Sequence, residues 1–261
     1  MIRDFGTLFA TAVKHRRIGH LVNLGRQVRQ QAFDLHDPFP TVEHADLAEF
    51  VGCADPQPIK LPPIEAVSLS GLGFLNPYAM LATITSALVP SKIFEIGTFR
   101  GVASLTFALN APQAQVYTLD LPPDSAVVDQ ASLSRGDKEW VRLSRSSVGF
   151  AFQGRPEQER IHQIYGDSLN FTPPEILKGS DLCFIDAGHS YECIAADTRT
   201  ALSVIRPGGV LVWDDYTWFV DGVKQYLTEL RHKLPLHRIA GTQLVLCKMT
   251  EENIASALTA N

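Results

Sequence analysis

Three aspartates and a histidine directly follow two apolar runs that are typical of buried strands. Asp186 ends one run, Asp214 and Asp215 end a later one, and His189 stands three residues after Asp186. Parallel strands lie about 4.8 Å apart and end at a common sheet edge, so we expect these side chains to converge. Three clustered carboxylates repel one another unless a cation or protons neutralise them, and oxygen-only ligands suit Mg²⁺. The pattern predicts a Mg²⁺ site; the alternative is that the aspartates only order turns.

His189 is the candidate general base. An imidazole has a pKa near neutrality, which suits the removal of a proton from a hydroxyl group. The alternative is a loop histidine that bonds to the backbone or orients Asp186. The residue type and position do not decide between these two roles.

A glycine-containing turn joins another apolar run to the next helical segment, and it reads Lys92-Ile-Phe-Glu-Ile-Gly-Thr-Phe-Arg-Gly101. Ligands of doubly wound sheets bind beyond the carboxyl ends of the strands, where glycines let the backbone approach them. A nicotinamide-binding fingerprint needs GxGxxG. Phe99 and Val102 stand where its second and third glycines belong, which disfavours a nucleotide-dependent oxidoreductase.

The remaining pattern, E-x-G-x-x-x-G, resembles the first motif of class I S-adenosylmethionine-dependent methyltransferases, and the middle phenylalanine resembles their O-methyltransferase branch. Asp120, at the end of the next strand, matches the carboxylate that accepts hydrogen bonds from the ribose. Gly166-Asp167-Ser168 matches the segment that contacts adenine. The resemblance implies an S-adenosylmethionine site made by Glu95, Gly97, Thr98, Phe99, Gly101, Asp120, Asp167, Ser168 and Asp186.

Three further segments are similar to a bacterial branch of small-molecule O-methyltransferases of the macrocin and catechol types. They are Phe184-Ile-Asp-Ala-Gly-His-Ser-Tyr191, Arg206-Pro-Gly-Gly209 and Val212-Trp-Asp-Asp-Tyr216. In those relatives the positions of Asp186, Asp214 and Asp215 carry the metal, and the third is often Asn. The resemblance implies Mg²⁺-assisted methylation of a small-molecule hydroxyl, with His189 and Asp186 as catalytic residues. It does not extend to residues 1–70.

Strand and helix patterns alternate along the catalytic part of the chain. We expect strands at 92–96, 115–119, 161–165, 181–185, 210–213, 236–240 and 243–248, and helices at 76–88, 102–110, 173–177, 191–205 and 220–234. This alternation predicts an α/β fold with a doubly wound, mostly parallel seven-stranded sheet, Rossmann-like in the methyltransferase manner. The last strand is predicted antiparallel, because a parallel return needs more chain than the tight connection at Gly241 offers.

The predicted organisation has three parts. Residues 1–70 form a helical N-terminal extension with a proline-rich linker at 38–63, residues 71–250 form the methyltransferase domain with a lid-like insertion at about 122–160, and residues 251–261 form a C-terminal tail. Residues 1–33 carry a net charge of +5 and an amphipathic pattern, so this segment is a candidate surface for homo-oligomers. The whole chain carries −5, and the remaining residues about −10, which argues against a nucleic-acid partner.

The composition excludes some settings. No apolar stretch approaches the roughly 18 residues of a membrane span, and the basic N-terminus lacks the features of a secretory signal. The four cysteines form no CxxC pair, which favours free thiols and a cytoplasmic location.

The acceptor remains open at this level. Sugars, polyketide glycosides and phenols all suit a pocket lined by Trp140, Phe150, Phe152 and Trp218. Two functional alternatives also stay open: a metal-independent methyltransferase in which His189 alone is the base, and a non-catalytic methyltransferase-like subunit.

Overall fold

The computed structural model describes residues 33–34, 37–55, 57–63, 75–124, 138, 142 and 147–258. Residues 1–32 of the predicted extension, residues 125–137 of the predicted insertion, and Trp140 lie outside this part. The chain divides into two compact units, of which the smaller comprises Met1–Pro38 and Thr217–Phe219. Within that unit the rings of Trp218 and Phe219 pack edge to face, with centroids 5.4 Å apart. All elements below belong to the larger unit, Phe39–Tyr216 with Val220–Asn261.

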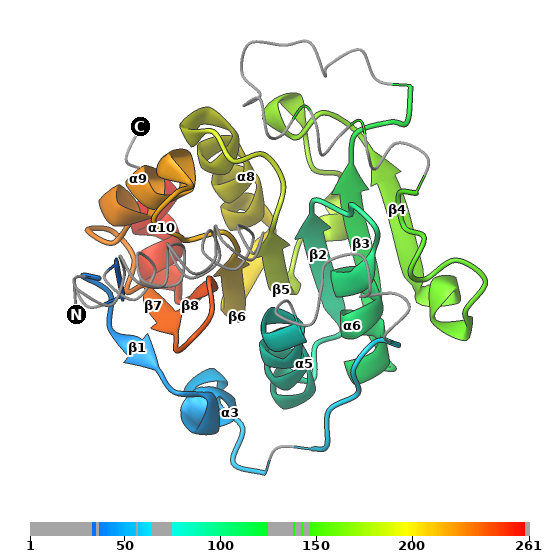
Figure 1. Cartoon of the computed structure of the whole chain (residues 1–261), viewed down its shortest axis with the longest axis horizontal. Helices are drawn as coiled ribbons and strands as arrows, with labels where there is room; N and C mark the ends of the chain where they lie inside the picture. Colours follow the sequence, from blue (N-terminus) through cyan, green and yellow to red (C-terminus); the bar gives the residue numbers. More distant parts are fainter. Residues whose placement is uncertain are drawn as a thin grey trace, which may run out of the picture. The chain divides into compact units, whose positions relative to one another are not determined.

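An eight-stranded sheet forms the centre of the larger unit (Figure 1), in the order β1-β7-β8-β6-β5-β2-β3-β4. The strands are β1 (Thr41–Val42), β2 (Lys92–Ile96), β3 (Gln115–Asp120), β4 (Ile161–Tyr165), β5 (Ser180–Ile185), β6 (Ile205–Trp213), β7 (His237–Ile239) and β8 (Val245–Lys248). β8 runs antiparallel to β6 and β7, and the other pairs are parallel. The predicted mostly parallel sheet with an antiparallel last strand is confirmed, with one strand more than predicted.

Helices cover the sheet in two groups. The α-helices are α3 (Leu47–Val51), α5 (Leu75–Leu88), α6 (Val102–Asn110), α8 (Tyr191–Val204), α9 (Asp221–Leu230) and α10 (Glu251–Leu258). Short 3₁₀ helices are η1 (His44–Asp46), η4 (Pro156–Arg160), η5 (Ser168–Asn170) and η6 (Glu175–Leu177). α5 packs against α3 and α6, while α8 packs against α9 and α10. Because parallel crossovers are right-handed and the strand order reverses between β2 and β5, α6 and α8 cover opposite faces.

The predicted surface linker at 38–63 is partly core. It contains the added strand β1, which pairs with β7, and the helix α3. Leu47, Ala48 and Val51 of α3 are buried in the main hydrophobic cluster. A two-residue strand and a single helical turn are too short for periodicity to reveal, so the prolines dominated the prediction.

Two helix ends also differ from the prediction. The helix predicted at 76–88 begins one residue earlier, at Leu75, and the Asn76 amide donates to the carbonyl of Gly241 at 3.2 Å. The predicted tail at 251–261 contains α10, which extends to Leu258. The four cysteines are free, as predicted. In the part of the chain that the structure describes, no helix is long and apolar enough to cross a membrane.

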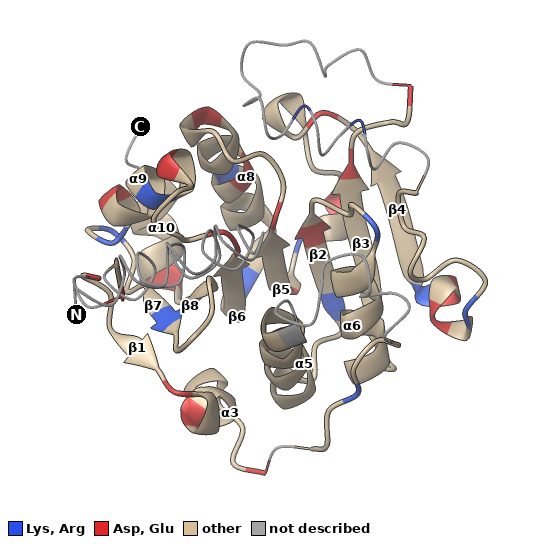
Figure 2. Cartoon of the chain, viewed as in Figure 1, with Lys and Arg blue, Asp and Glu red and all other residues tan. Residues whose placement is uncertain are grey.

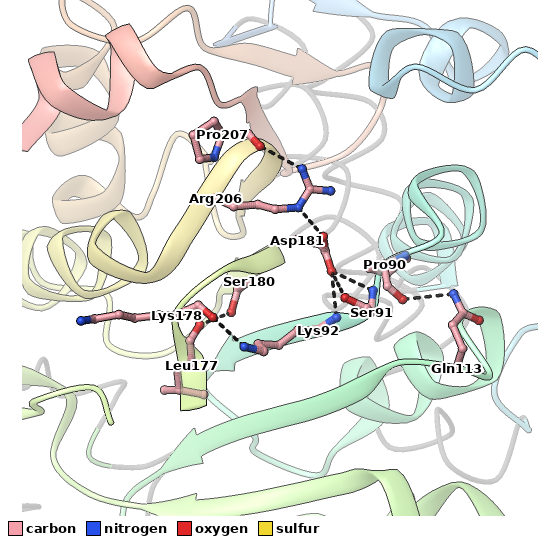
Figure 3. Close-up of polar contacts among 10 residues, drawn as sticks. All are labelled: Pro90, Ser91, Lys92, Gln113, Leu177, Lys178, Ser180, Asp181, Arg206 and Pro207. Atoms are coloured by element: carbon pink, nitrogen blue, oxygen red, sulfur yellow. Dashed lines mark hydrogen bonds and ion pairs between the residues drawn. The ribbon is translucent and has the colours of Figure 1, made fainter. Parts of the chain in front are cut away.

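Asp181 connects the amino ends of the central strands through hydrogen bonds and an ion pair (Figure 3). Its carboxylate accepts hydrogen bonds from the backbone N–H of Ser91 at 2.7 Å and of Lys92 at 2.9 Å, and pairs with the guanidinium of Arg206. Burial raises the pKa of the Asp181 carboxyl, but the ion pair with Arg206 and these hydrogen bonds lower it more, so the net pKa lies below the usual value. This cluster joins β2, β5 and β6 at the edge opposite the carboxyl ends.

Asp181→Ala should lower the free energy of unfolding by about 2–3 kcal/mol, because it removes the carboxylate that accepts the N–H groups of Ser91 and Lys92 and pairs with Arg206. A carboxyl with a lowered folded-state pKa stabilises fully above its unfolded pKa of about 3.9 and ceases to do so as the pH falls through the folded value. The difference between the variant and the wild type should therefore be constant above about pH 5 and shrink below about pH 4. Denaturant titrations of both proteins across this pH range measure the difference.

Glu175→Ala is the matched control, because Glu175 pairs with Lys178 at 2.8 Å but its side chain is 82% exposed. Exposed pairs contribute about 0–1 kcal/mol. Equal losses in the two variants, or a difference independent of pH, would contradict the role given to Asp181.

Candidate active site

The predicted site residues meet at the carboxyl edge of the sheet. Ile96 of β2 is in register with Leu119 of β3 and Ile185 of β5, and Ile185 is in register with Trp213 of β6. The segments that follow these strands therefore leave the sheet side by side. Acidic residues are concentrated at these strand ends (Figure 2).

Gly97 is required by a close approach of two backbones. It has a φ of 103°, and its N–H donates to the carbonyl of Leu119 at 2.8 Å. A Cβ at this position would lie 1.9 Å from the carbonyl oxygen of Asp186. The prediction explained Gly97 by the approach of a ligand. The structure fills that space with the chain leaving β5 instead, so Gly97 fixes Asp186 relative to the turn.

Asp120 closes the turn after β2. Its carboxylate accepts the N–H of Phe99 at 2.6 Å with one oxygen and the N–H of Leu121 at 2.7 Å with the other. Phe99 has a φ of 46°, which is unusual for a residue with a bulky side chain. Burial raises the pKa of the Asp120 carboxyl in spite of these hydrogen bonds. Each carboxylate oxygen has two acceptor positions, so Asp120 retains capacity for a ligand hydroxyl.

Thr98 and Glu95 point into the protein. The Thr98 hydroxyl lies 2.6 Å from that of Thr118 and accepts from the Gln163 amide at 2.9 Å. Glu95 is fully buried, and Ser104 donates to one of its oxygens while the other has no hydrogen-bond partner. Burial raises the pKa of Glu95 to about 8. The side chains of both residues make their contacts inside the protein, and only their backbones lie along the turn.

Part of the predicted lid is fixed to this turn. The N–H of Gly149 donates to the carbonyl of Phe99 at 2.9 Å, and that of Ala151 to the carbonyl of Arg100 at 2.8 Å. A Cβ at Gly101 would lie 2.6 Å from the ring of Phe152, which is buried in the core. Phe152 was predicted to line an acceptor pocket, but it packs on the glycine turn because Gly101 leaves room for its ring.

The segment after β4 reaches the same edge. The N–H of Gly166 donates to the carbonyl of Asp120 at 2.9 Å. Asp167 caps η5, accepting the N–H of Leu169 at 3.1 Å and the amide of Asn170 at 2.9 Å. The structure thus brings this segment next to Asp120.

Asp186 and Asp214 form a half-buried acidic pair. Loss of hydration is the largest cause that raises the pKa of Asp186, followed by the charges of Asp214 and Asp215. Burial and the charge of Asp215 raise the pKa of Asp214 to about 7. A cation or a proton at this pair would relieve the repulsion between the carboxylates.

Asp215 faces His189 and Gln243. One of its oxygens is hydrogen-bonded to Nε2 of His189, and the other accepts from the Gln243 amide at 3.0 Å. Among the residues that the structure describes, no three His, Cys, Asp or Glu side chains are grouped so as to hold a metal ion. Asp215, predicted as the third metal ligand, is instead placed to orient the imidazole of His189.

Residues 94–216 match the sequence model of a methyltransferase domain family. The doubly wound sheet and the glycine turn after β2 agree with that match. Residues 94–216 are thus similar to a methyltransferase domain, and their strands belong to the doubly wound sheet.

Individual relatives are O-methyltransferases by name. The chain is 30% identical over 149 residues to O-methyltransferase hkm8 of Aspergillus hancockii, covering 54% of this chain and 50% of that protein. It is 25% identical over 160 residues to catechol O-methyltransferase B of Danio rerio, covering 59% and 52%. The chain thus spans about half the length of the curated relatives it matches.

A solved structure shares the fold of this chain. The O-methyltransferase TomG of Streptomyces achromogenes, involved in tomaymycin synthesis and solved with SAM, superposes with a TM-score of 0.51 at 18% identity. The match covers 74% of this chain and 92% of TomG. At this identity the likeness concerns the fold.

Two further residues near the candidate site carry no clear sequence signal. Burial raises the pKa of the Tyr78 phenol on α5, and the charges of Asp186 and Asp214 raise it further. Gln243 reaches Asp215 from the turn between β7 and β8. Both come from segments far from the motifs in sequence, and neither residue type is distinctive at its position.

Gly97→Ala should destabilise the protein more than Gly179→Ala. Both glycines have positive φ, 103° and 76°, so each substitution brings backbone strain of about 1–2 kcal/mol. Nothing lies within 4 Å of a Cβ at Gly179, whereas a Cβ at Gly97 meets the backbone of Asp186. We expect the clash to add about 1–3 kcal/mol to the loss of unfolding free energy, measured by denaturant titration. Equal losses would show that Asp186 does not constrain the turn.

Proposed function

We propose that the chain is an S-adenosylmethionine-dependent O-methyltransferase that acts on the hydroxyl group of a small molecule. The observation that carries this proposal is the position of the His189–Asp215 pair at the edge where the Asp120-closed glycine turn lies. A donor site and a base for an acceptor hydroxyl are thus adjacent. The three proteins compared above, each named as an O-methyltransferase, support this reaction.

The donor half of the site is the turn Gly97–Gly101 with Asp120, Asp167 and Ser168. We propose that Asp120 accepts hydrogen bonds from the ribose hydroxyls while it holds Phe99 in place. The segment at Asp167 and Ser168 would contact adenine, and the backbone along Glu95 and Thr98 would line the remainder of the donor. When bound, the donor supplies a methyl group on a positively charged sulfur. The carboxylates at this edge of the sheet favour a cationic ligand.

The acceptor half is the acidic pair with His189. Mg²⁺ is commonly held by one or two carboxylates and several waters, so Asp186 and Asp214 fit this ion without a third carboxylate. Their mutual repulsion, which raises both pKa values, would be relieved by the ion. When bound, the ion supplies orientation of the acceptor hydroxyl and a lower pKa for it. We therefore revise the predicted three-aspartate site to a two-aspartate site.

His189 removes the acceptor proton in this proposal. As the acceptor oxygen forms its bond to the methyl carbon, the bond between that carbon and sulfur breaks, and the sulfur leaves as a neutral thioether. The acceptor proton passes to the imidazole, whose positive charge Asp215 stabilises. Positioning the two reactants in line accounts for most of the rate, because alignment is worth up to about 7–11 kcal/mol.

Donor binding is the first test. Calorimetry should show binding of S-adenosylmethionine, and Asp120→Ala should weaken it at least tenfold, because the turn loses its closing contact and the donor loses its hydroxyl acceptor. Asp221→Ala is the control, since Asp221 pairs with Lys224 and is 88% exposed. Unchanged affinity in Asp120→Ala, or preferential binding of NAD, would remove the donor assignment. Donor binding without turnover of phenol, catechol or sugar acceptors would indicate a non-catalytic subunit.

Metal dependence is the second test, and it separates the two pairs of residues. Mg²⁺ should raise the melting temperature of the wild type, His189→Ala and Asp215→Asn, but not of Asp186→Ala or Asp214→Ala. His189→Ala should lower the rate by roughly 10²–10⁴-fold. Activity should disappear in EDTA and return with excess Mg²⁺. Full activity in EDTA would show that proton transfer needs only His189 and Asp215. If Mg²⁺ fails to stabilise His189→Ala, His189 is a metal ligand.

A further inference from the structure

Asp215 adopts a strained backbone conformation that its neighbours hold. Its φ is 61°, in the left-handed region that residues with a side chain seldom occupy. Such conformations cost on the order of 1–3 kcal/mol and persist where the surroundings determine them. The N–H of Asp215 donates to its neighbour Asp214 at 2.7 Å, while its carboxylate is bound on both sides by His189 and Gln243. The orientation of Asp215 is thus set by contacts.

Gln243 makes two of the contacts around Asp215. Its side-chain amide donates to Oδ1 of Asp215 at 3.0 Å, and its backbone carbonyl accepts the N–H of Tyr216 at 3.0 Å. The first contact selects one rotation of the carboxylate, and the second fixes the backbone that follows it. Because Gln243 occupies one oxygen, the other oxygen is directed toward His189.

The turn that carries Gln243 is itself rigid. The hydroxyl of the buried Thr242 donates to the carbonyl of Ile239 at 2.9 Å and accepts the N–H of Leu244 at 3.1 Å. The guanidinium of Arg238, also buried, donates to the carbonyl of Thr242 at 3.0 Å. These hydrogen bonds hold the turn in place, so a side chain on the turn can fix the orientation of the residue that it contacts.

We propose that Gln243 is a positioning residue of the active site, which holds Asp215, and through it His189, in the orientation needed for proton transfer. The proposal rests on the proposed function. An amide suits this task because it is a neutral donor: it binds the carboxylate without neutralising the charge that stabilises an imidazolium. A carboxylate in its place would repel Asp215, and an ammonium group would compete with His189 for it.

Gln243 has a second acidic neighbour, which the test must separate from the first. Burial and the charge of Asp215 raise the pKa of Asp214, and hydrogen bonding by Gln243 opposes them. If Gln243 acted through Asp214 it would bear on the proposed Mg²⁺ pair. The hydrogen bond at 3.0 Å to Asp215 assigns it to the pair with His189.

The decisive variant is Gln243→Met, which keeps the length of the side chain and the backbone carbonyl but removes the amide donor. We expect kcat to fall roughly 10- to 100-fold, with the Kd of S-adenosylmethionine and the melting temperature little changed. Gln243→Glu should lose at least as much, since it replaces a donor by a like charge. Gln225→Met is the control, because Gln225 is an exposed residue of α9 whose side-chain amide donates to Glu229 at 3.2 Å.

A double variant shows through which residue Gln243 acts. In an Asp215→Ala background, Gln243→Met should change kcat less than about twofold, because the residue through which Gln243 acts is absent. A full effect in the Asp215→Ala background would overturn the proposal. So would a loss of kcat that is matched by equal losses of donor affinity and thermal stability, because that is the behaviour of a merely structural residue.

A measurement independent of activity keeps this inference separate from the proposed function. ¹⁵N NMR of His189 should show the tautomer protonated on Nε2 in the wild type, because Asp215 accepts from that nitrogen. Gln243→Met should convert part of the population to the other tautomer, and Gln225→Met should not. An unchanged tautomer would overturn the proposal even if methyl transfer were confirmed. Absence of methyl transfer with a changed tautomer would refute the proposed function and leave the positioning role of Gln243 intact.

Discussion

The backbone of Asp186 passes Gly97 at a distance that leaves no room for a side chain. This approach connects the two halves of the candidate site, because Gly97 begins the turn that would hold the donor and Asp186 begins the loop that carries His189. The hydrogen bonds on either side, from Gly97 to Leu119 and from Asp186 to Ile96, continue the sheet for one residue beyond β2 and β5. A displacement of one loop therefore displaces the other. Donor and acceptor alignment, on which an in-line methyl transfer depends, is built into the sheet itself.

Carboxylates at the two edges of the sheet have opposite environments. At the amino edge Asp181 receives a guanidinium and backbone donors, and its pKa is lowered (Figure 3). At the carboxyl edge Asp186 and Asp214 have mainly each other and Asp215 as charged neighbours, and their pKa values are raised. The first arrangement stabilises the fold, and the second leaves charge that a ligand can neutralise. This difference distinguishes a site from a structural cluster more clearly than residue type does.

The candidate site residues are supported by neighbouring segments of the chain. Residues 149–152 hold the glycine turn through two backbone hydrogen bonds and the ring of Phe152. The turn between β7 and β8 holds Asp215 through Gln243. Both supports bind strained residues, Phe99 and Asp215, whose φ values are positive. Strain at such positions persists only where rigid neighbours oppose its relaxation.

The sequence by itself determined the alternation of strands and helices in residues 71–250 and the chemical types of the candidate site residues. The bounds of β2, β4 and α6 were predicted without error, and the candidate site residues lie at or near predicted strand ends. Only the tertiary structure decided the partners. That Asp215 faces His189, that Phe152 packs on Gly101, and that Gln243 contacts Asp215 depend on contacts between segments distant in the chain. Local periodicity reports which face of an element is buried, and it carries no information on which distant side chain meets that face.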